Sequence, residues 1–271
     1  MRTFRSKLKK KAATLLAVSM LATSLMGMSI ASANTGLEMP DDFTVTPSRD
    51  AFLPRFSMPT DVTTTTVGAA GYHWAAADIF DMMAVGSLKG YPDKMFRPNK
   101  AVTRAEFATA MTRGLQLPSP EDSVELRDLS EKHWAFKDVQ KALPYLAMLP
   151  DGSFRPGTAA TREDVAVALV MATGLDKRVA DPVAIDLIFA DYKTVSPDLR
   201  ALVAVAVDQK LIKGYKVLKA DGQYTDAAGL KYNLEIRGQS FVTRGEVAHL
   251  LNESRKNMSL GFKLAPGTEL E

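Results

Sequence analysis

The same order of short motifs occurs three times along this chain, clearly in two copies and in diverged form in a third. Such internal repeats predict units that are too small to be stable alone and that bury their apolar faces against one another. Copy one contains His73-Trp74-Ala75, Gly90-Tyr91-Pro92-Asp93, Phe96-Arg97-Pro98 and Thr103-Arg104-Ala105-Glu106. Copy two contains His133-Trp134-Ala135, Pro150-Asp151-Gly152, Phe154-Arg155-Pro156 and Thr161-Arg162-Glu163-Asp164.

Copies two and three depart from copy one at definite points. Copy two has no counterpart of the pair Gly90-Tyr91. Copy three begins at Phe189-Ala190-Asp191 and carries Pro197 in place of the tryptophan. It keeps Gly214-Tyr215, closes with Thr243-Arg244-Gly245-Glu246, and contains an insertion at about 216–240.

Each copy has the apolar spacing of two helices. In copy one, four apolar residues fall at i, i+3, i+4 and i+7, the pattern of one helix face: Ala76, Ile79, Phe80 and Met83. A second apolar stripe begins four residues after each motif threonine, at Phe107, Val165 and Val247. We therefore expect a mainly all-α fold of three helix-turn-helix repeats, with room for a small hairpin in the insertion of repeat three.

The two ends of the chain lack this pattern. Residues 1–33 hold six basic and no acidic side chains, and their apolar run ends in Ala31-Ser32-Ala33. This layout is typical of a secretory signal peptide cleaved after Ala33, and the polar residues within the run disfavour the alternative of an uncleaved membrane anchor. The predicted organisation is a signal peptide at 1–33, a Pro/Thr-rich leader at 34–71, repeats at 72–117, 126–175 and 187–255, and a tail at 256–271.

Charge and cysteine content exclude several classes of protein. Without the six basic residues of the signal, 28 basic residues face 31 acidic ones, a net charge of about −3. Because the chain also lacks a basic stripe or a nucleic-acid-binding motif, we expect no nucleic acid partner. The absence of cysteine excludes disulfides, a thiol nucleophile and a cysteine-type zinc cluster.

The order His-Trp-Ala, Gly-Tyr-Pro-Asp, Phe-Arg-Pro and Thr-Arg-Ala-Glu resembles the S-layer homology repeat, and the resemblance covers about residues 72–255. It implies three repeats arranged as a pseudo-threefold spindle with three prongs. It also implies that the grooves between prongs bind secondary cell-wall polysaccharide, often carrying a pyruvate ketal. The implied location is the cell wall of a bacterium.

The motif that closes each copy serves two purposes. Thr103 with Glu106 fits a capping box, in which a hydroxyl and a carboxylate three residues later satisfy free backbone N–H groups of a helix start. The arginine that follows each threonine opposes the positive end of the helix dipole, so it calls for an anion. For Arg104, Arg162 and Arg244 that anion is either a ligand carboxylate or an acidic side chain of a neighbouring repeat, such as Asp128 or Asp191; the resemblance favours the ligand.

Other motif residues are candidate sugar contacts. Trp74 and Trp134 are the only tryptophans, and each is either a core residue or a flat platform for a sugar ring; the resemblance implies the platform. Tyr91, Asp93, Asp151 and Tyr215 either bind sugar hydroxyls or stabilise turns. His73 and His133 lie in separate copies without carboxylates at ligand spacing, so we expect no metal and no cofactor.

The predicted function is therefore non-covalent anchoring to the bacterial cell wall by binding secondary cell-wall polysaccharide, which is the expected partner. The alternative is an adaptor of the same fold that binds another surface protein, with degenerate sugar sites. The nucleophile elbow, metalloprotease and phosphate-loop motifs are missing, so we expect no enzyme. A wall hydrolase is the third reading, since only carboxylate separation in space decides it. No membrane partner is expected after signal cleavage.

Overall fold

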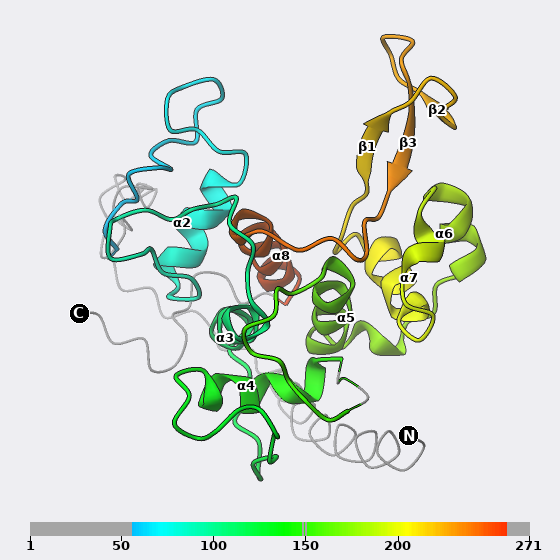
Figure 1. The fold of residues 1–271 in the computed structure, drawn as a ribbon. Coiled ribbons are helices and arrows are strands. Elements are labelled where there is room, and N and C mark those ends of the chain that lie inside the picture. Colours follow the sequence, from blue (N-terminus) through cyan, green and yellow to red (C-terminus); the bar gives the residue numbers. More distant parts are fainter. Residues whose placement is uncertain (1–55, 148, 150, 259–271) are drawn as a thin grey trace, which may run out of the picture. The chain divides into compact units, whose positions relative to one another are not determined.

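In a computed structural model of the chain, the described residues are 56–147, 149 and 151–258 (Figure 1). The chain divides into two compact units, and all described residues belong to the second, Pro54–Glu271. The predicted signal peptide lies outside the described residues, as do the first part of the leader and the tail beyond residue 258.

The described residues form α-helices, short 3-10 helices and one antiparallel sheet. The α-helices are α2 (Ala76–Ala84), α3 (Arg104–Gly114), α4 (Phe136–Ala142), α5 (Arg162–Ala172), α6 (Pro182–Ile188), α7 (Arg200–Asp208) and α8 (Arg244–Asn257). The 3-10 helices are Leu143–Tyr145, Leu175–Lys177 and Tyr192–Thr194. The strands are β1 (Tyr215–Leu218), β2 (Tyr224–Thr225) and β3 (Lys231–Glu235).

The expectation of a mainly all-α fold is wrong. Helix accounts for only 38% of the structure, and the three strands make the fold mixed α/β. The strand order is β1-β3-β2, with Tyr215 opposite Glu235 and Tyr224 opposite Tyr232. The repeat pattern did not predict this sheet because the strands lie within the insertion of copy three, which has no counterpart in the other copies.

Helices pair across the copies rather than within them. The contacts place α2 against α8, α3 against α4, and α5 against α7 (Figure 1). The first helix of each copy therefore packs on the second helix of the preceding copy, and copy one packs on copy three. This cyclic packing buries the apolar helix faces that a single copy would leave exposed.

Three backbone hydrogen bonds close this exchange into a ring. Val102 N donates to Val242 O at 3.0 Å, Ala160 N donates to Val102 O at 2.9 Å, and Val242 N donates to Ala160 O at 3.0 Å. Each of these residues stands directly before a capping threonine. The ring therefore brings the N-termini of α3, α5 and α8 together.

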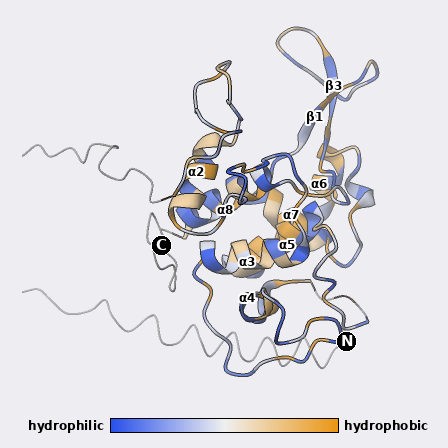
Figure 2. Ribbon diagram, turned by 60° about the vertical axis from the view of Figure 1, so that its left-hand side comes forward, coloured by the Kyte–Doolittle hydropathy of each residue, from blue (hydrophilic) through white to orange (hydrophobic). Residues whose placement is uncertain are grey.

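The three N-termini are capped as the sequence predicts. Thr103, Thr161 and Thr243 each form a complete capping box with the acidic residue three positions on. The stripes that follow are buried, with Phe107, Val165 and Val247 at most 2% exposed. In Figure 2 the hydrophobic colouring is concentrated in the helices, α5 and α7 among them, whereas β3 is mainly hydrophilic. Within the described residues, no helix combines the length and the apolarity needed to cross a bilayer.

Candidate functional site

A strained arginine marks the same turn in all three copies. Arg97, Arg155 and Arg237 have φ of 58°, 55° and 54°, in the left-handed region that costs a non-glycine residue about 1 kcal/mol or more. Such strain persists only where neighbouring groups enforce it, and it is concentrated at functional sites. The recurrence of this conformation points to a role for the arginine side chain, not only for the turn.

One aspartate enforces each of these turns. Asp61 accepts hydrogen bonds from the N–H groups of Phe96 and Arg97, both at 2.7 Å. Asp128 binds Phe154 and Arg155 in the same way, and Asp191 binds Ile236 and Arg237. Asp128 and Asp191 therefore hold turns and are not the partners of the motif arginines. The acidic partners in neighbouring repeats are instead Asp164 for Arg104 and Glu246 for Arg162. Asp61, which the sequence analysis assigned to the leader, does the same for copy one.

The motif arginines are buried and reach across copies. Arg104, Arg162 and Arg244 are 7%, 6% and 6% exposed. Arg104 donates to the carbonyl oxygens of Phe154 and Ala147 and pairs with Asp164 at 3.0 Å. Its partners are therefore all in copy two, and the acid is the capping-box residue of α5.

Arg244 has the same arrangement at the junction of copies three and one. It donates to Phe96 O at 2.8 Å and to Lys89 O at 2.6 Å. Burial lowers the pKa of Arg244, while Tyr91 and the capping-box Glu106 oppose that shift. An arginine remains protonated at neutral pH despite such a shift, so copy three provides a buried positive charge behind the copy-one turn.

Arg162 differs from the other two. Its guanidinium donates to Lys213 O and, at 3.0 Å, to the hydroxyl of Tyr215, and it lies 3.6 Å from Glu246. Its Nε is buried without a hydrogen-bond partner, whereas Arg104 and Arg244 use this atom to bind a turn carbonyl. Tyr215 donates in turn to Glu246, and its burial together with this bond raises the pKa of Tyr215 to about 12. Tyr215 is therefore committed to an internal network.

Tyr91 lies at the centre of a cationic cluster on the surface. The guanidinium of Arg97, the ammonium of Lys100 and the guanidinium of Arg244 lie 4.5, 4.8 and 4.8 Å from its ring centroid. Lys100 donates to the Tyr91 hydroxyl at 2.9 Å, and Asp93 pairs with Arg97 at 2.5 Å. We call Tyr91, Asp93, Arg97, Lys100 and Arg244 the Tyr91 cluster. The cluster holds three cations and one carboxylate, and two further carboxylates, Asp61 and Glu106, act on Arg244 from nearby.

Both tryptophans are exposed, which removes the core alternative. Trp74 and Trp134 are 54% and 62% exposed. His73 and His133 stand beside them with ring centroids at 5.5 Å, and each imidazole accepts a hydrogen bond from the N–H of the alanine after the tryptophan. The histidines therefore fix the loop that presents each tryptophan.

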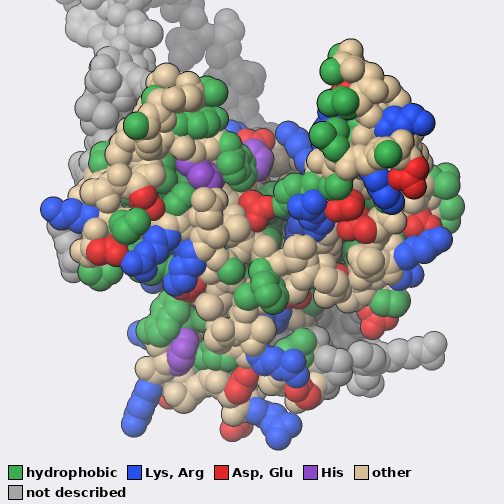
Figure 3. Space-filling view, turned by 45° about the horizontal axis from the view of Figure 1, so that its top comes forward, with side chains coloured by type: hydrophobic (Ala, Val, Ile, Leu, Met, Phe, Trp, Pro, Cys, Tyr) green, Lys and Arg blue, Asp and Glu red, His purple; other side chains and the backbone are tan. Residues whose placement is uncertain are grey.

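A shallow hollow links Trp74's neighbourhood to the Tyr91 cluster. It is lined by Asp61, Tyr72, His73, Met95, Arg97, Pro98, Asn99 and Lys100. His73 Nε2 lies 3.2 Å from Asn99 Oδ1 across its floor. In Figure 3, basic and acidic side chains lie interspersed over the face shown, and both kinds reach solvent there.

The corresponding surface of copy two is simpler. Asp151 pairs with Arg155 at 2.8 Å and accepts two hydrogen bonds from Ser153, and these bonds lower the pKa of Asp151. Leu149 stands where copy one has Tyr91. This surface has an exposed tryptophan and an arginine but lacks the aromatic centre.

Tyr91 and Arg104 both lie in copy one, but the structure joins Tyr91 to Arg244 and Arg104 to copy two. It also brings in Arg97 and Lys100, which are not among the site residues predicted from the sequence. The recurring Phe-Arg-Pro motif was the available signal for Arg97, whereas Lys100 has no counterpart in the repeat pattern.

Comparison with known proteins identifies the motif. The family model of the S-layer homology domain matches residues 85–108, which run from the end of α2 through the Tyr91 turn into α3. The chain therefore carries S-layer homology sequence at these residues. The match includes all of the Tyr91 cluster except Arg244.

The relatives that match this chain are much longer than the matched region. It is 34% identical to "Cell surface glycoprotein 1" of Acetivibrio thermocellus over 37% of this chain and 5% of that protein. It is 35% identical to the "Cellulosome-anchoring protein" of the same organism over 34% of this chain and 21% of that protein. It is 27% identical to "Amylopullulanase" of Thermoanaerobacterium thermosulfurigenes over 60% of this chain and 9% of that protein. The matched region thus spans about a fifth or less of each relative.

Proposed function

We propose that this protein anchors non-covalently to the bacterial cell wall by binding an anionic secondary cell-wall polysaccharide at Trp74 and the Tyr91 cluster. The observation that carries the proposal is an exposed tryptophan together with three cations gathered around Tyr91. The S-layer homology domain and the anchoring and cell-surface names of the relatives support a location at the cell surface.

The chemistry of the cluster suits a sugar that carries a carboxylate. An exposed indole packs against the C–H face of a pyranose, as aromatic side chains do at binding surfaces. The guanidinium of Arg97 can form two charge-assisted hydrogen bonds with a carboxylate, such as that of a pyruvate ketal. The ligand carboxylate would then replace Asp93, with which Arg97 forms an exposed ion pair. That exposed pair is worth under about 1 kcal/mol, so a ligand can displace it.

The three copies are not equivalent in this proposal. Copy one supplies both Trp74 and the Tyr91 cluster, copy two supplies Trp134 with Arg155 and Asp151, and copy three has Pro197 in place of a tryptophan. We propose that polysaccharide affinity falls in that order. Arg104 contributes by holding the turn of copy two, whereas Arg162 binds Lys213 and Tyr215 of copy three.

The rest of the proposed biology follows the expectations from the sequence. The chain is exported by its signal peptide, acts without a cofactor and has no catalytic role of its own. The enzymes among the relatives match it over a small share of their length, in keeping with an accessory module in those proteins. The repeat boundaries, the leader and the tail keep the ranges given above.

A protein-binding adaptor is the second candidate, favoured by the exposed apolar side chains around α6. Val179, Val183 and Leu187 are 93%, 66% and 68% exposed. An adaptor would bind a surface protein equally well in the presence of excess polysaccharide. A wall-binding module would be released from the wall by the same polysaccharide.

The deciding experiment titrates the protein with isolated wall polysaccharide, with and without its pyruvate groups. Trp74→Ala should weaken binding at least about tenfold, as base–aromatic stacking of about 1–3 kcal/mol suggests for a comparable flat contact. Trp134→Ala is the matched control, because it removes an equally exposed tryptophan with the same histidine neighbour. The proposed site would be contradicted if the original protein, Trp74→Ala and Trp134→Ala bound the polysaccharide with equal affinity. It would also be contradicted if the original protein bound the polysaccharide equally well with and without its pyruvate groups.

A further inference from the structure

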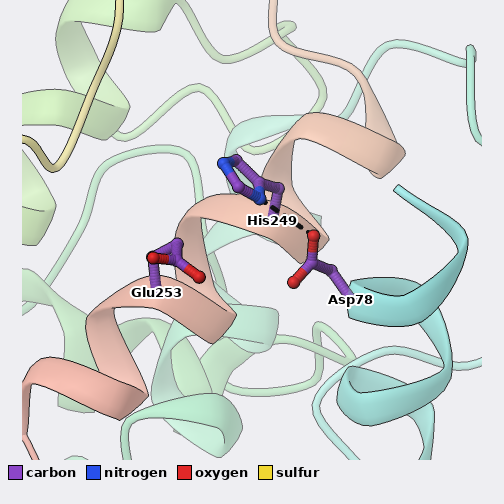
Figure 4. A group of neighbouring side chains, drawn as sticks. All are labelled: Asp78, His249 and Glu253. Atoms are coloured by element: carbon purple, nitrogen blue, oxygen red, sulfur yellow. Dashed lines mark hydrogen bonds and ion pairs between the residues drawn. The ribbon is translucent and has the colours of Figure 1, made fainter. Parts of the chain in front are cut away.

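Three potential metal ligands meet where α2 packs on α8. His249 and Glu253 lie one turn apart on α8, and Asp78 faces them from α2 (Figure 4). One ligand atom from each of these residues lies within 4.8 Å of the other two. His249 Nδ1 is 2.8 Å from Asp78 Oδ2. The cluster shares no residue with the Tyr91 cluster, and none of its three side chains is part of the proposed wall-binding site.

The other two cross-copy helix pairs show what is unusual here. Counting from the capping threonines, the positions of His249 and Glu253 correspond to Thr109 and Arg113 on α3, and to Val167 and Met171 on α5. Counting from Trp74, the position of Asp78 corresponds to Asp138 and Ala201.

The α3–α4 pair balances its charge with an arginine. Arg113 pairs with Asp138 at 3.1 Å. The corresponding positions of the α5–α7 pair, Val167, Met171 and Ala201, are uncharged. At the α2–α8 pair, Glu253 occupies the arginine position, so a second carboxylate stands near Asp78 together with an imidazole. A bound cation here would neutralise the carboxylates between α2 and α8, as Arg113 neutralises Asp138 between α3 and α4.

We infer that Asp78, His249 and Glu253 bind a divalent transition-metal cation of the Zn²⁺ class, which ties copy one to copy three. One imidazole and two carboxylates form a three-ligand set that Zn²⁺ accepts with water in the fourth position. The imidazole favours Zn²⁺ over Ca²⁺ and Mg²⁺, which prefer oxygen ligands.

The surroundings orient this ligand set. Asn252 donates to Asp78 Oδ1 at 2.8 Å, which leaves Oδ2 directed at His249. Hydrogen bonds from neighbours that fix a ligand in this way are usual around metal sites.

Two existing contacts must yield to the ion. The cation replaces the proton between His249 and Asp78, and Glu253 gives up its pair with Lys256 at 2.7 Å. The Lys256 pair is exposed, with side chains 58% and 42% accessible, so its loss costs little. The site is open enough for entry, since the side chains of His249 and Asp78 are 31% and 16% exposed.

Trp74 provides a built-in reporter. Its ring meets the ring of His249 edge-on, at 5.5 Å between centroids. In a Trp134→Phe variant of the full chain without an affinity tag, Trp74 is the sole tryptophan. Its emission therefore reports on His249.

The experiment adds Zn²⁺ to this variant and follows Trp74 emission and the Tm, with Mg²⁺ and Ca²⁺ as comparison ions. Zn²⁺ should change the emission saturably at about one ion per chain and raise the Tm by several degrees, since an ion that binds only the folded state stabilises it. His249→Ala should abolish both effects. His73→Ala and His133→Ala, which remove the other two histidines in turn, should preserve them.

Glu253→Arg is the sharpest variant, because it copies the Arg113–Asp138 pair. It should raise the Tm in the absence of metal and eliminate the response to Zn²⁺. The inference is overturned if Zn²⁺ leaves the starting protein unchanged, or if the response survives in His249→Ala or Glu253→Arg. A response to Mg²⁺ equal to that to Zn²⁺ would also overturn it.

Discussion

The guanidinium of Arg244, near the end of the chain, lies 4.8 Å from the ring centroid of Tyr91, in the first copy. The same side chain binds the carbonyl oxygens of Phe96 and Lys89. One residue of copy three thus supports both the turn and the aromatic centre of the copy-one surface.

Arg244→Ala should therefore affect both folding and binding. It leaves two carbonyl oxygens without their donor, at a cost of about 1–3 kcal/mol in the free energy of unfolding, and it removes a cation from behind Tyr91. Arg244→Lys should recover only part of the stability and part of the binding, because lysine lacks the planar guanidinium with its two parallel donors. Urea unfolding beside polysaccharide titration measures both effects. Arg113→Ala is the control, since its half-exposed pair with Asp138 should cost under about 1 kcal/mol.

Substitutions of Thr103, the N-cap of α3, and of Thr109, within α3, should change the stability of the protein in opposite directions. Thr103→Ala removes the capping box and should lower the free energy of unfolding by about 1 kcal/mol. The Oγ1 of Thr109 is buried without a hydrogen-bond partner, so Thr109→Val removes a desolvation penalty and should raise stability by about 1 kcal/mol. Denaturant midpoints of both variants provide the comparison, and a destabilised Thr109→Val would mean that its hydroxyl has a partner.

Tyr215 should produce a loss of stability at alkaline pH. Its folded pKa is raised to about 12 from the ordinary 10.0, so the folded state keeps a proton that the unfolded state releases. The stabilisation is complete below pH 10 and is lost as the pH rises towards 12. The difference in unfolding free energy between the original protein and Tyr215→Phe, measured across this range, isolates Tyr215 from the lysines. A constant difference would contradict the network with Glu246 and Arg162.

The sequence predicts local structure well where the signal is local. The capping boxes at Thr103, Thr161 and Thr243 and the buried stripe starting at Phe107 follow from spacing alone, because both depend on residues within one helical turn. A small hairpin was expected in the insertion of repeat three, but its strands and their order could not be predicted because an insertion has no second copy to compare with.

The partners of the arginines could not be read from the sequence for a different reason. The repeats show which residues recur within a copy, but the helices exchange between copies, so the arginines bind partners in the next copy. The ring of Val102, Ala160 and Val242 helps to fix which arginine meets which turn. The left-handed conformation of Arg97 is likewise imposed by Asp61, which lies before the first recognised motif.

Arg97→Gly tests the central claim most directly, because it separates the folding and binding roles of the copy-one surface. Glycine adopts φ of 58° without strain, so the substitution should leave the free energy of unfolding unchanged or raise it by up to about 1 kcal/mol. Affinity for the anionic wall polysaccharide should nevertheless fall at least about tenfold, since the exposed fork is lost. Arg155→Gly, with φ of 55°, relieves the same strain in copy two and should reduce affinity less. Undiminished polysaccharide binding by Arg97→Gly would contradict the account.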